Sequence, residues 1–134
     1  MLRELSPSDR ELIQAATKAF DRAYAPYSQF QVGAAVLTST GEIFAGCNVE
    51  NASYGLSMCA ERNAIANAII GHGKDTMKID AIAIANSQDV PCSPCGACRQ
   101  VIWEFGQDAR IIFQNSQGWQ TATIKDLLPE GFTL

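Results

Sequence analysis

Hydrophobic residues recur every three to four positions in three stretches of the chain, the spacing that predicts amphipathic helices. These stretches cover residues 6–24, 59–70 and 95–105. The first opens on hydroxyl and acidic side chains that can cap a helix, and Pro26 ends it. A Gly-His-Gly segment at residues 71–73 ends the second. We therefore expect three helices, separated by stretches of a different period.

Five short apolar or alternating stretches predict β-strands, at residues 30–38, 42–47, 79–85, 110–113 and 119–124. A Ser-Thr-Gly turn joins the first two strands into a hairpin, and the later strands alternate with helices. The polar, Asn-rich residues 48–57 predict a loop. The whole pattern predicts an α/β fold with one domain over residues 1–134, a three-layer α/β/α sandwich around a five-stranded mixed sheet.

The composition favours a folded domain and argues against several partners. Of the 134 residues, 47% are hydrophobic and 18% are charged, which is enough apolar side chain for a core. The net charge is −4 and the basic residues form no run, so we expect no nucleic-acid partner. No apolar run approaches the roughly 20 residues of a transmembrane helix, and the start of the chain is too polar for a signal peptide. We expect no membrane association and a cytoplasmic location.

Five cysteines stand out in a chain expected in the cytoplasm, where disulfides are rare. Metal ligands, catalytic thiols and core residues all remain open interpretations. We interpret Cys47 and Cys92 as buried small residues or neighbours of a site. The single histidine, His72, lies between two glycines in a predicted turn. We expect it to face solvent and not to bind a metal.

The densest chemistry lies in the segment Pro-Cys-Gly-Ala-Cys at residues 94–98. A Cys-x-x-Cys pair in the first turn of a helix can aim both sulfurs at one point, and the helix N-terminus favours their thiolate forms. Cys59 opens another predicted helix and gains the same bias. If the two helix starts face each other, Cys59, Cys95 and Cys98 converge, and three protein ligands leave the open position of a catalytic zinc.

Glu61 follows Cys59 by two residues, within the same first turn. Its carboxylate can lie beside a zinc-bound water without binding the metal. Because zinc lowers the pKa of its water to about 7, an adjacent carboxylate can shuttle the proton as general base and acid. Zinc deaminases carry this combination, a His- or Cys-x-Glu followed later by Pro-Cys-x-x-Cys.

The residues alone leave other interpretations open. A Cys-x-x-Cys pair also occurs in redox motifs and zinc ribbons, although a redox motif needs neither Cys59 nor Glu61. The spacing of Cys92, Cys95 and Cys98 also allows a structural zinc with four thiolates, as in a non-enzymatic, zinc-stabilised interaction module. That alternative predicts a closed site and no role for Glu61.

Taken together, the motifs resemble those of the cytidine deaminase family, specifically its short-chain type. The resemblance rests on the entry to the first strand, the nucleoside-binding loop, two zinc motifs and a C-terminal signature, at residues 25–35, 48–55, 59–62, 94–100 and 127–132. It implies one Zn²⁺ per chain on Cys59, Cys95 and Cys98, which leaves Cys92 out.

The resemblance also implies roles for residues around the metal. Glu61 would carry protons from the water to the pyrimidine ring nitrogen and then to the leaving ammonia. Asn48 and Glu50 would hold the sugar hydroxyls, since a 3′-hydroxyl can accept from an amide and donate to a carboxylate. Phe30 would pack on the pyrimidine face, and the backbone N–H of Ala60 would bind the pyrimidine carbonyl.

Two further implications concern charge and assembly. Arg62 would donate to the thiolate sulfurs and draw off charge, because three thiolates on Zn²⁺ leave a net negative charge that weakens the Lewis acid. Family members of this length are usually homotetramers, in which Tyr54 and Phe132 reach into neighbouring sites. We therefore expect sites completed by other subunits. Glu130 stands where the family more often has a small residue.

The expected reaction is hydrolytic deamination of cytidine and 2′-deoxycytidine to uridine and 2′-deoxyuridine with release of ammonia, as in pyrimidine salvage. An alternative is a related deaminase acting on the nucleoside antibiotic blasticidin S, but Asn48 and Glu50 favour an ordinary ribose. A polynucleotide substrate is disfavoured by the acidic balance and by the lack of extra chain to grip flanking nucleotides.

Overall fold

The structure is a computed structural model that describes residues 5–134. Along the chain these residues form α1 (Pro7–Phe20), β1 (Val32–Thr38), β2 (Ile43–Cys47), the short 3₁₀ helix η1 (Tyr54–Leu56), α2 (Ala60–His72), β3 (Ile79–Asn86), α3 (Gly96–Phe105), β4 (Arg110–Asn115), β5 (Gly118–Thr123) and α4 (Ile124–Leu127). The strands form one five-stranded sheet in the order β2-β1-β3-β4-β5. The β3–β4 pair is parallel and the other pairs are antiparallel, so the expected mixed sheet is confirmed.

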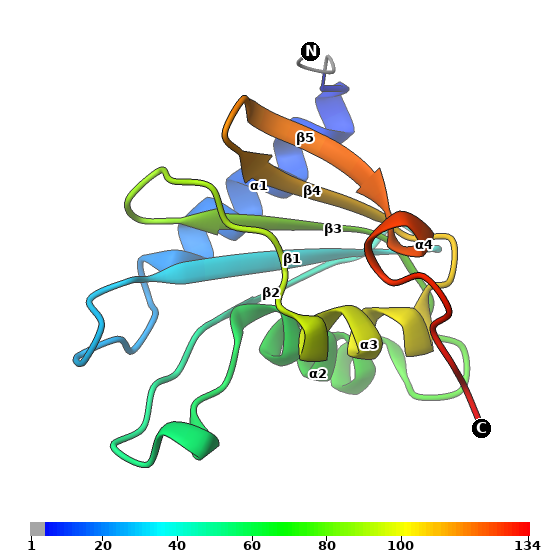
Figure 1. Ribbon diagram of the computed structural model, residues 1–134. Coiled ribbons are helices and arrows are strands. Elements are labelled where there is room, and N and C mark those ends of the chain that lie inside the picture. The colour runs from blue at the N-terminus through cyan, green and yellow to red at the C-terminus, as the bar shows by residue number, and fades with distance from the viewer. Residues whose placement is uncertain (1–4) are drawn as a thin grey trace.

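The sheet is covered on both faces. Helix α1 packs on one face, whereas α2, α3 and α4 lie on the other (Figure 1). Leu12 and Ile112 belong to the core beneath α1, and Ile65 and Ile102 belong to the core beneath α2 and α3. The expected three-layer α/β/α architecture is therefore confirmed. Within residues 5–134, no helix combines the length and the apolar character that crossing a membrane requires.

Two glycines in the sheet let the helices approach closely. A Cβ added at Gly33 would lie 1.9 Å from the carbonyl oxygen of Ala16 in α1. A Cβ at Gly46 would lie 2.3 Å from the backbone nitrogen of Ala64 in α2. Because both neighbours are backbone atoms, neither contact can be relieved by a rotamer change. Gly46 thus sets the distance between β2 and the helix whose first turn carries the predicted zinc motif.

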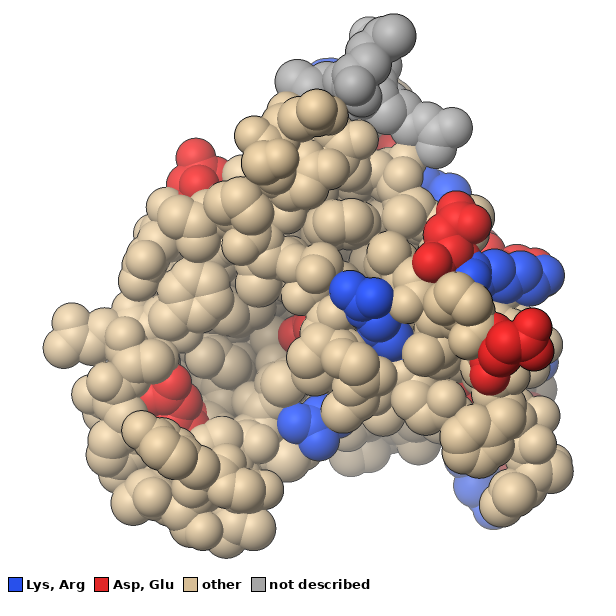
Figure 2. Space-filling view, in the orientation of Figure 1, with Lys and Arg blue, Asp and Glu red and all other residues tan. Residues whose placement is uncertain are grey.

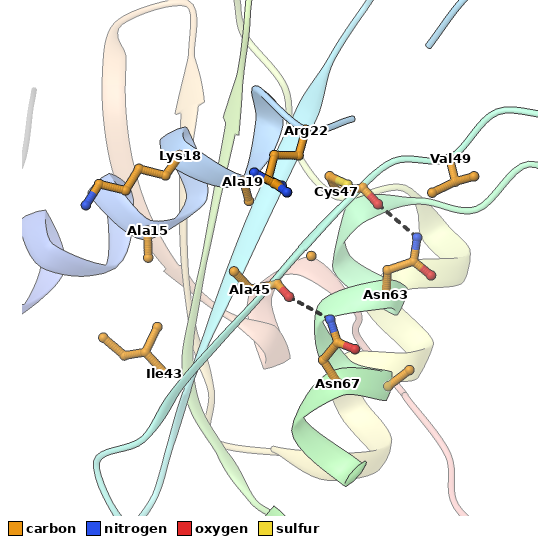
Figure 3. A pocket seen from close by; sticks show the side chains of 12 residues that line it. Ala15, Lys18, Ala19, Arg22, Ile43, Ala45, Cys47, Val49, Asn63 and Asn67 are labelled. Carbon is orange, nitrogen blue, oxygen red and sulfur yellow. Dashed lines mark hydrogen bonds between the residues drawn. The ribbon is translucent and has the colours of Figure 1, made fainter. Parts of the chain in front are cut away.

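Two asparagines of α2 hydrogen-bond to β2, one of the two edge strands of the sheet. Asn63 and Asn67 donate to the carbonyl oxygens of Cys47 and Ala45, each at 2.8 Å (Figure 3). Edge strands with free carbonyls are templates for pairing with another strand, and these side chains occupy two of them. A hollow of about 830 Å³ lies here between α1, β2 and α2, away from Cys59, Cys95 and Cys98.

The first helix is shorter than the sequence predicts. It ends at Phe20 and not near Tyr24, because the Tyr24 backbone pairs with the segment that follows β2. The N–H of Tyr24 donates to the carbonyl of Asn48 at 3.1 Å, and the carbonyl of Tyr24 accepts from the N–H of Glu50 at 2.8 Å. The first strand likewise begins at Val32, two residues later than expected.

The end of the fifth strand also differs from the prediction. Ile124, expected to end that strand, begins α4, and the hydroxyl of Thr123 caps this helix by accepting from the N–H of Asp126 at 3.2 Å. Ile124 is fully buried. An apolar residue placed after a strand fits either element, so the periodicity alone could not separate them.

The prediction that His72 faces solvent is wrong. Only 10% of its side chain is exposed, and its two ring nitrogens hydrogen-bond to Glu42 and Thr76. The C-terminal end of α2 lies over the β1–β2 hairpin, which carries Glu42, so the ring is covered by residues remote in sequence. Among residues 5–134, the group that could hold a metal does not include His72.

Candidate active site

Two helix N-termini bring three thiols together. Cys59 is the N-cap of α2, Cys95 is the N-cap of α3, and Cys98 lies in the first turn of α3. Their Sγ atoms all lie within 4.8 Å of one another, and those of Cys59 and Cys95 are 3.9 Å apart. A tetrahedral zinc with Zn–S bonds of about 2.3 Å places its sulfurs about 3.8 Å apart. The soft donor set and this spacing therefore fit Zn²⁺.

The fourth candidate thiol does not join the cluster. Among residues 5–134 the group that could hold a metal comprises Cys59, Cys95 and Cys98, without Cys92. Cys92 is half-buried and its backbone pairs with Gln114 at the end of β4. A closed site with four thiolates therefore has no support in this geometry.

Hydrogen bonds distribute the protons among the thiols. The Cys98 thiol and the Arg62 guanidinium donate to Cys59 and hold its pKa well below its usual range, against the effect of burial. The same contact with Cys59, together with burial, raises the pKa of Cys98. Arg62 Nη2 lies 3.5 Å from Cys59 Sγ, which places its charge beside the cluster. A divalent cation between the sulfurs would favour the thiolate form of all three.

Glu61 lies in the first turn of α2 and is only 5% exposed. Burial, with a smaller contribution from the negative charge on Cys59, raises its pKa to about 6. A carboxyl group with a pKa near neutrality can both take up and release a proton at physiological pH. Such a shift in a pocket is typical of a functional site.

A cavity of about 430 Å³ opens in front of these groups, a volume in the range of small-molecule sites. Figure 2 shows this face of the molecule hollowed between the loop of residues 48–58, at the lower left, and the body of the protein. Seven of the predicted site residues line the cavity: Asn48, Glu50, Tyr54, Cys59, Ala60, Glu61 and Cys95. The remaining four are not among its lining residues: Phe30, Arg62, Cys98 and Phe132.

Asn48 and Glu50, which line the cavity, are both held by hydrogen bonds from other parts of the chain. The Asn48 amide accepts from the N–H of Val32 and donates to the carbonyl of Phe30, both at 2.9 Å. Glu50 accepts from Ser28 and from backbone N–H groups, and these hydrogen bonds lower its pKa. Its carboxylate is therefore ionised at neutral pH and fixed beside the cavity.

Tyr54 lines the cavity, whereas Phe132 is not among its lining residues. Their exposed fractions are 84% and 65%. The carbonyl of Phe132 accepts from Gln100 Nε2 at 3.0 Å, which holds the C-terminal segment on α3. Glu130 adopts a φ of 61°, a left-handed conformation that side chains larger than glycine disfavour.

Comparison with known proteins agrees with this geometry. The family model for the cytidine and deoxycytidylate deaminase zinc-binding region matches residues 6–115. The chain belongs to the cytidine deaminase family. The resemblance inferred from the motifs is thereby confirmed, and the three-cysteine cluster is the family's zinc site, one per chain.

Individual family members are similar over nearly the whole chain. The cytidine deaminase of Halalkalibacterium halodurans is 46% identical over 128 residues, which cover 93% of this chain and 95% of the relative. The crystal structure of cytidine deaminase from Burkholderia pseudomallei is 43% identical, with a TM-score of 0.81 and coverage of 96% and 100%. The blasticidin-S deaminase of Bacillus cereus is 31% identical, with coverage of 96% and 95%.

Two residues that support the site were missed by the sequence analysis. Ser28 holds Glu50, and Arg99 donates to the carbonyls of Pro94 at 2.8 Å and Leu127 at 2.9 Å. Arg99 thereby ties the loop before α3 to α4. Neither residue carries a signal of its own, because a serine in a polar turn and an arginine on a helix are ordinary surface residues. Their roles depend on partners remote in sequence.

Proposed function

We propose that this chain catalyses the hydrolytic deamination of cytidine and 2′-deoxycytidine. The observation that carries the proposal is the buried carboxyl of Glu61 in the same first turn as Cys59 and at the wall of the cavity. The reaction consumes one water and yields uridine or 2′-deoxyuridine and one ammonia. Cys59, Cys95 and Cys98 hold the zinc.

Glu61 is the proposed catalytic proton carrier. When bound, zinc supplies the activation of a water molecule for attack at neutral pH. Glu61 takes a proton from the attacking water as the water oxygen bonds to C4 of the pyrimidine. Glu61 then delivers this proton to the ring nitrogen N3. A second proton, passed from the new hydroxyl through Glu61 to the amino group, lets the C4–N bond break and ammonia leave. Burial of the carboxyl favours its protonated form, which suits a group that must release a proton as well as accept one.

Substrate recognition is assigned to the remaining lining residues. Asn48 retains one amide hydrogen that no hydrogen bond among residues 5–134 uses, and Glu50 presents an ionised carboxylate, so the pair can donate to and accept from one ribose hydroxyl. The N–H of Ala60, at the start of α2, is one of the helix-terminal donors and suits the pyrimidine carbonyl. Phe30 is assigned to the pyrimidine face.

Arg62 is proposed to tune the metal. Its guanidinium donates to Cys59 Sγ, and it draws charge from a cluster whose three thiolates outweigh the charge of the zinc. A less negative cluster makes the zinc a stronger Lewis acid.

We further propose that the protein is a homotetramer whose sites are completed by neighbouring subunits. The rings of Tyr54 and Phe132 are largely exposed in the isolated chain, which supports their burial against other copies. Sedimentation velocity should give a mass about four times that of the chain. A monomer with full activity would refute the proposal. We propose a cytoplasmic location, because thiol ligands need a reducing compartment.

The activity test uses purified, zinc-loaded protein with cytidine, 2′-deoxycytidine and blasticidin S as separate substrates. We expect ammonia release and the ultraviolet change of deamination with the first two. The 31% identity to a blasticidin-S deaminase makes the third substrate the necessary comparison. Turnover of blasticidin S alone would replace the proposed substrate, and absence of turnover on all three, with zinc bound, would refute enzymatic deamination of these nucleosides.

A further inference from the structure

A turn of the chain wraps around the carboxylate of Glu50. The backbone N–H groups of Tyr27 and Ser28 donate to Glu50 Oε1 at 3.0 and 3.1 Å. The hydroxyl of Ser28 donates to the other oxygen, Oε2. A carboxylate offers about four acceptor positions, two on each oxygen. Among the described residues, 5–134, the donors Tyr27 and Ser28 fill three of them, so one position, on Oε2, is left for a ligand.

The Ser28 hydroxyl also reaches the segment that leads into β1. Its oxygen accepts from the N–H of Phe30 at 3.0 Å, while the carbonyl of Phe30 accepts from the amide of Asn48 at 2.9 Å. One hydroxyl therefore connects the carboxylate of Glu50 to the backbone of Phe30. Between Ser28 and Phe30, Gln29 has a φ of 58°, a conformation that is disfavoured unless the surrounding structure holds it.

Hydrogen bonds, more than packing, hold this turn. Tyr27 is 53% exposed, and Ser28 and Gln29 are exposed as well. Without the Ser28 hydroxyl, Glu50 Oε2 would lose its partner within the chain, and the carboxylate could rotate about its terminal bond. The backbone donors to Oε1 would remain, so the loop itself would keep much of its structure.

We propose that Ser28 is a positioning residue for nucleoside binding, which acts by fixing the Glu50 carboxylate so that Oε2 accepts a single sugar hydroxyl. This inference rests on the proposed function, because it deepens the role assigned to Glu50. With one acceptor position free, Glu50 accepts a hydrogen bond from one hydroxyl of the sugar and makes no hydrogen bond with the other. A nucleoside that lacks only the 2′-hydroxyl can therefore still satisfy the site through its 3′-hydroxyl.

The test compares Ser28→Ala and Ser28→Thr on cytidine and on 2′,3′-dideoxycytidine, which has neither hydroxyl. Loss of a hydrogen bond to a charged group corresponds to about a 10- to 100-fold effect. We expect Ser28→Ala to lower kcat/KM by this factor on cytidine and by less than about twofold on dideoxycytidine. Ser28→Thr keeps the hydroxyl and should retain most of the activity. Ser39→Ala, in the turn at the opposite end of β1, is the matched control and should leave both substrates unaffected.

A second comparison separates action through Glu50 from a role in the fold. In a Glu50→Ala background, adding Ser28→Ala should cost less than about twofold, because the group that Ser28 positions is already gone. Equal losses on cytidine and dideoxycytidine, or undiminished loss in the Glu50→Ala background, would overturn the proposal.

Binding of the product provides a test that does not need turnover. Calorimetry with uridine and 2′,3′-dideoxyuridine should show Ser28→Ala weakening the first and not the second. If the wild-type protein binds uridine but deaminates nothing, the proposed function fails while this binding comparison still decides the role of Ser28. If it binds neither nucleoside, the role of Ser28 is overturned as well.

Discussion

Replacement of Glu61 by glutamine is predicted to abolish most of the activity and at the same time to stabilise the metal-free protein. Glutamine keeps the shape of the side chain but can neither take up a proton nor carry a charge. If Glu61 carries protons in deamination, kcat on cytidine should fall by at least about 100-fold. The zinc content should stay unchanged, because Glu61 is not one of the clustered thiol ligands.

The gain in stability follows from burial. Glu61 is 5% exposed, and in the metal-free protein its pKa rises from 4.5 to about 6. One pKa unit corresponds to about 1.4 kcal/mol, so the ionised carboxyl lowers the free energy of unfolding by about 2 kcal/mol at pH 7.5. Because the folded state binds the proton more tightly than the unfolded state, stability is lost as the pH rises from about 4.5 through about 6. Glutamine carries no such cost.

The assay is urea denaturation of chelator-treated wild-type protein and Glu61→Gln, at pH 7.5 and pH 5. We expect the variant to be more stable by about 2 kcal/mol at the higher pH and by less than about 1 kcal/mol at the lower. Glu104→Gln, on the exposed side of α3, is the matched control and should change neither stability nor activity. The reasoning is refuted if Glu61→Gln keeps wild-type kcat, or if its stability difference is absent or independent of pH.

Three further predictions concern the metal, the packing of α2 and an ion pair. Cys92→Ser should retain about one zinc per chain by atomic absorption, whereas Cys98→Ser should lose it; the reverse result would exclude the assigned ligands. Gly46→Ala should lower the free energy of unfolding by about 1–3 kcal/mol in urea, because its Cβ would meet the Ala64 backbone, whereas Gly55→Ala, with open space around it, should not. Burial raises the pKa of Asp9, but the hydrogen bonds with Arg110, at 2.9 Å, and with Ser6 outweigh this effect, so the pKa of Asp9 is lowered. The stabilisation that ionised Asp9 provides is therefore present above pH 3.8 and is lost as the pH falls through the lower pKa that Asp9 has in the folded state. Measured by thermal denaturation, Asp9→Asn should lower the free energy of unfolding by about 1–2 kcal/mol at pH 7 and by less at pH 3. An equal cost at both pH values would contradict this assignment.

The parts of the molecule that the sequence predicts well are those set by local signals. Helical spacing and strand alternation predict the main elements, because each element must bury one face against its neighbours. Cys95 and Cys98 are close in sequence and share one turn, so their convergence needs no knowledge of the fold. That Cys59 joins them was conditional on two helix starts facing each other, and the structure confirms that condition.

The parts that the sequence does not predict depend on partners far along the chain. Helix α1 stops early because Tyr24 pairs with residues beyond β2. His72 is covered because α2 ends over the β1–β2 hairpin. The three hydrogen bonds that fix Glu50 come from a turn more than 20 residues earlier. In each case a side chain of ordinary type acquires its role from a contact that periodicity cannot show.

The topology explains why the metal ligands and the proposed sugar-binding residues meet. Strand β1 is antiparallel to both β2 and β3, so the start of β1 lies beside the ends of β2 and β3. Asn48 follows β2, Val32 begins β1, and the loop after β3 leads to Cys95 at the start of α3. Residues remote in sequence therefore gather at one end of the sheet, as ligands commonly do in α/β folds.

The two halves of the site rest on supports of different rigidity. The thiols and Glu61 are fixed by the first turns of two helices packed on the sheet, whereas Glu50 is fixed by hydrogen bonds from an exposed turn. A substitution on the helix side is therefore expected to disturb the metal or the proposed proton carrier, with effects on every substrate. If Glu50 binds the sugar as proposed, a substitution on the turn side should weaken only that contact, with effects that vanish when the substrate lacks its hydroxyls. The proposed roles thus predict that chemistry and nucleoside selection can be separated by mutation in this fold.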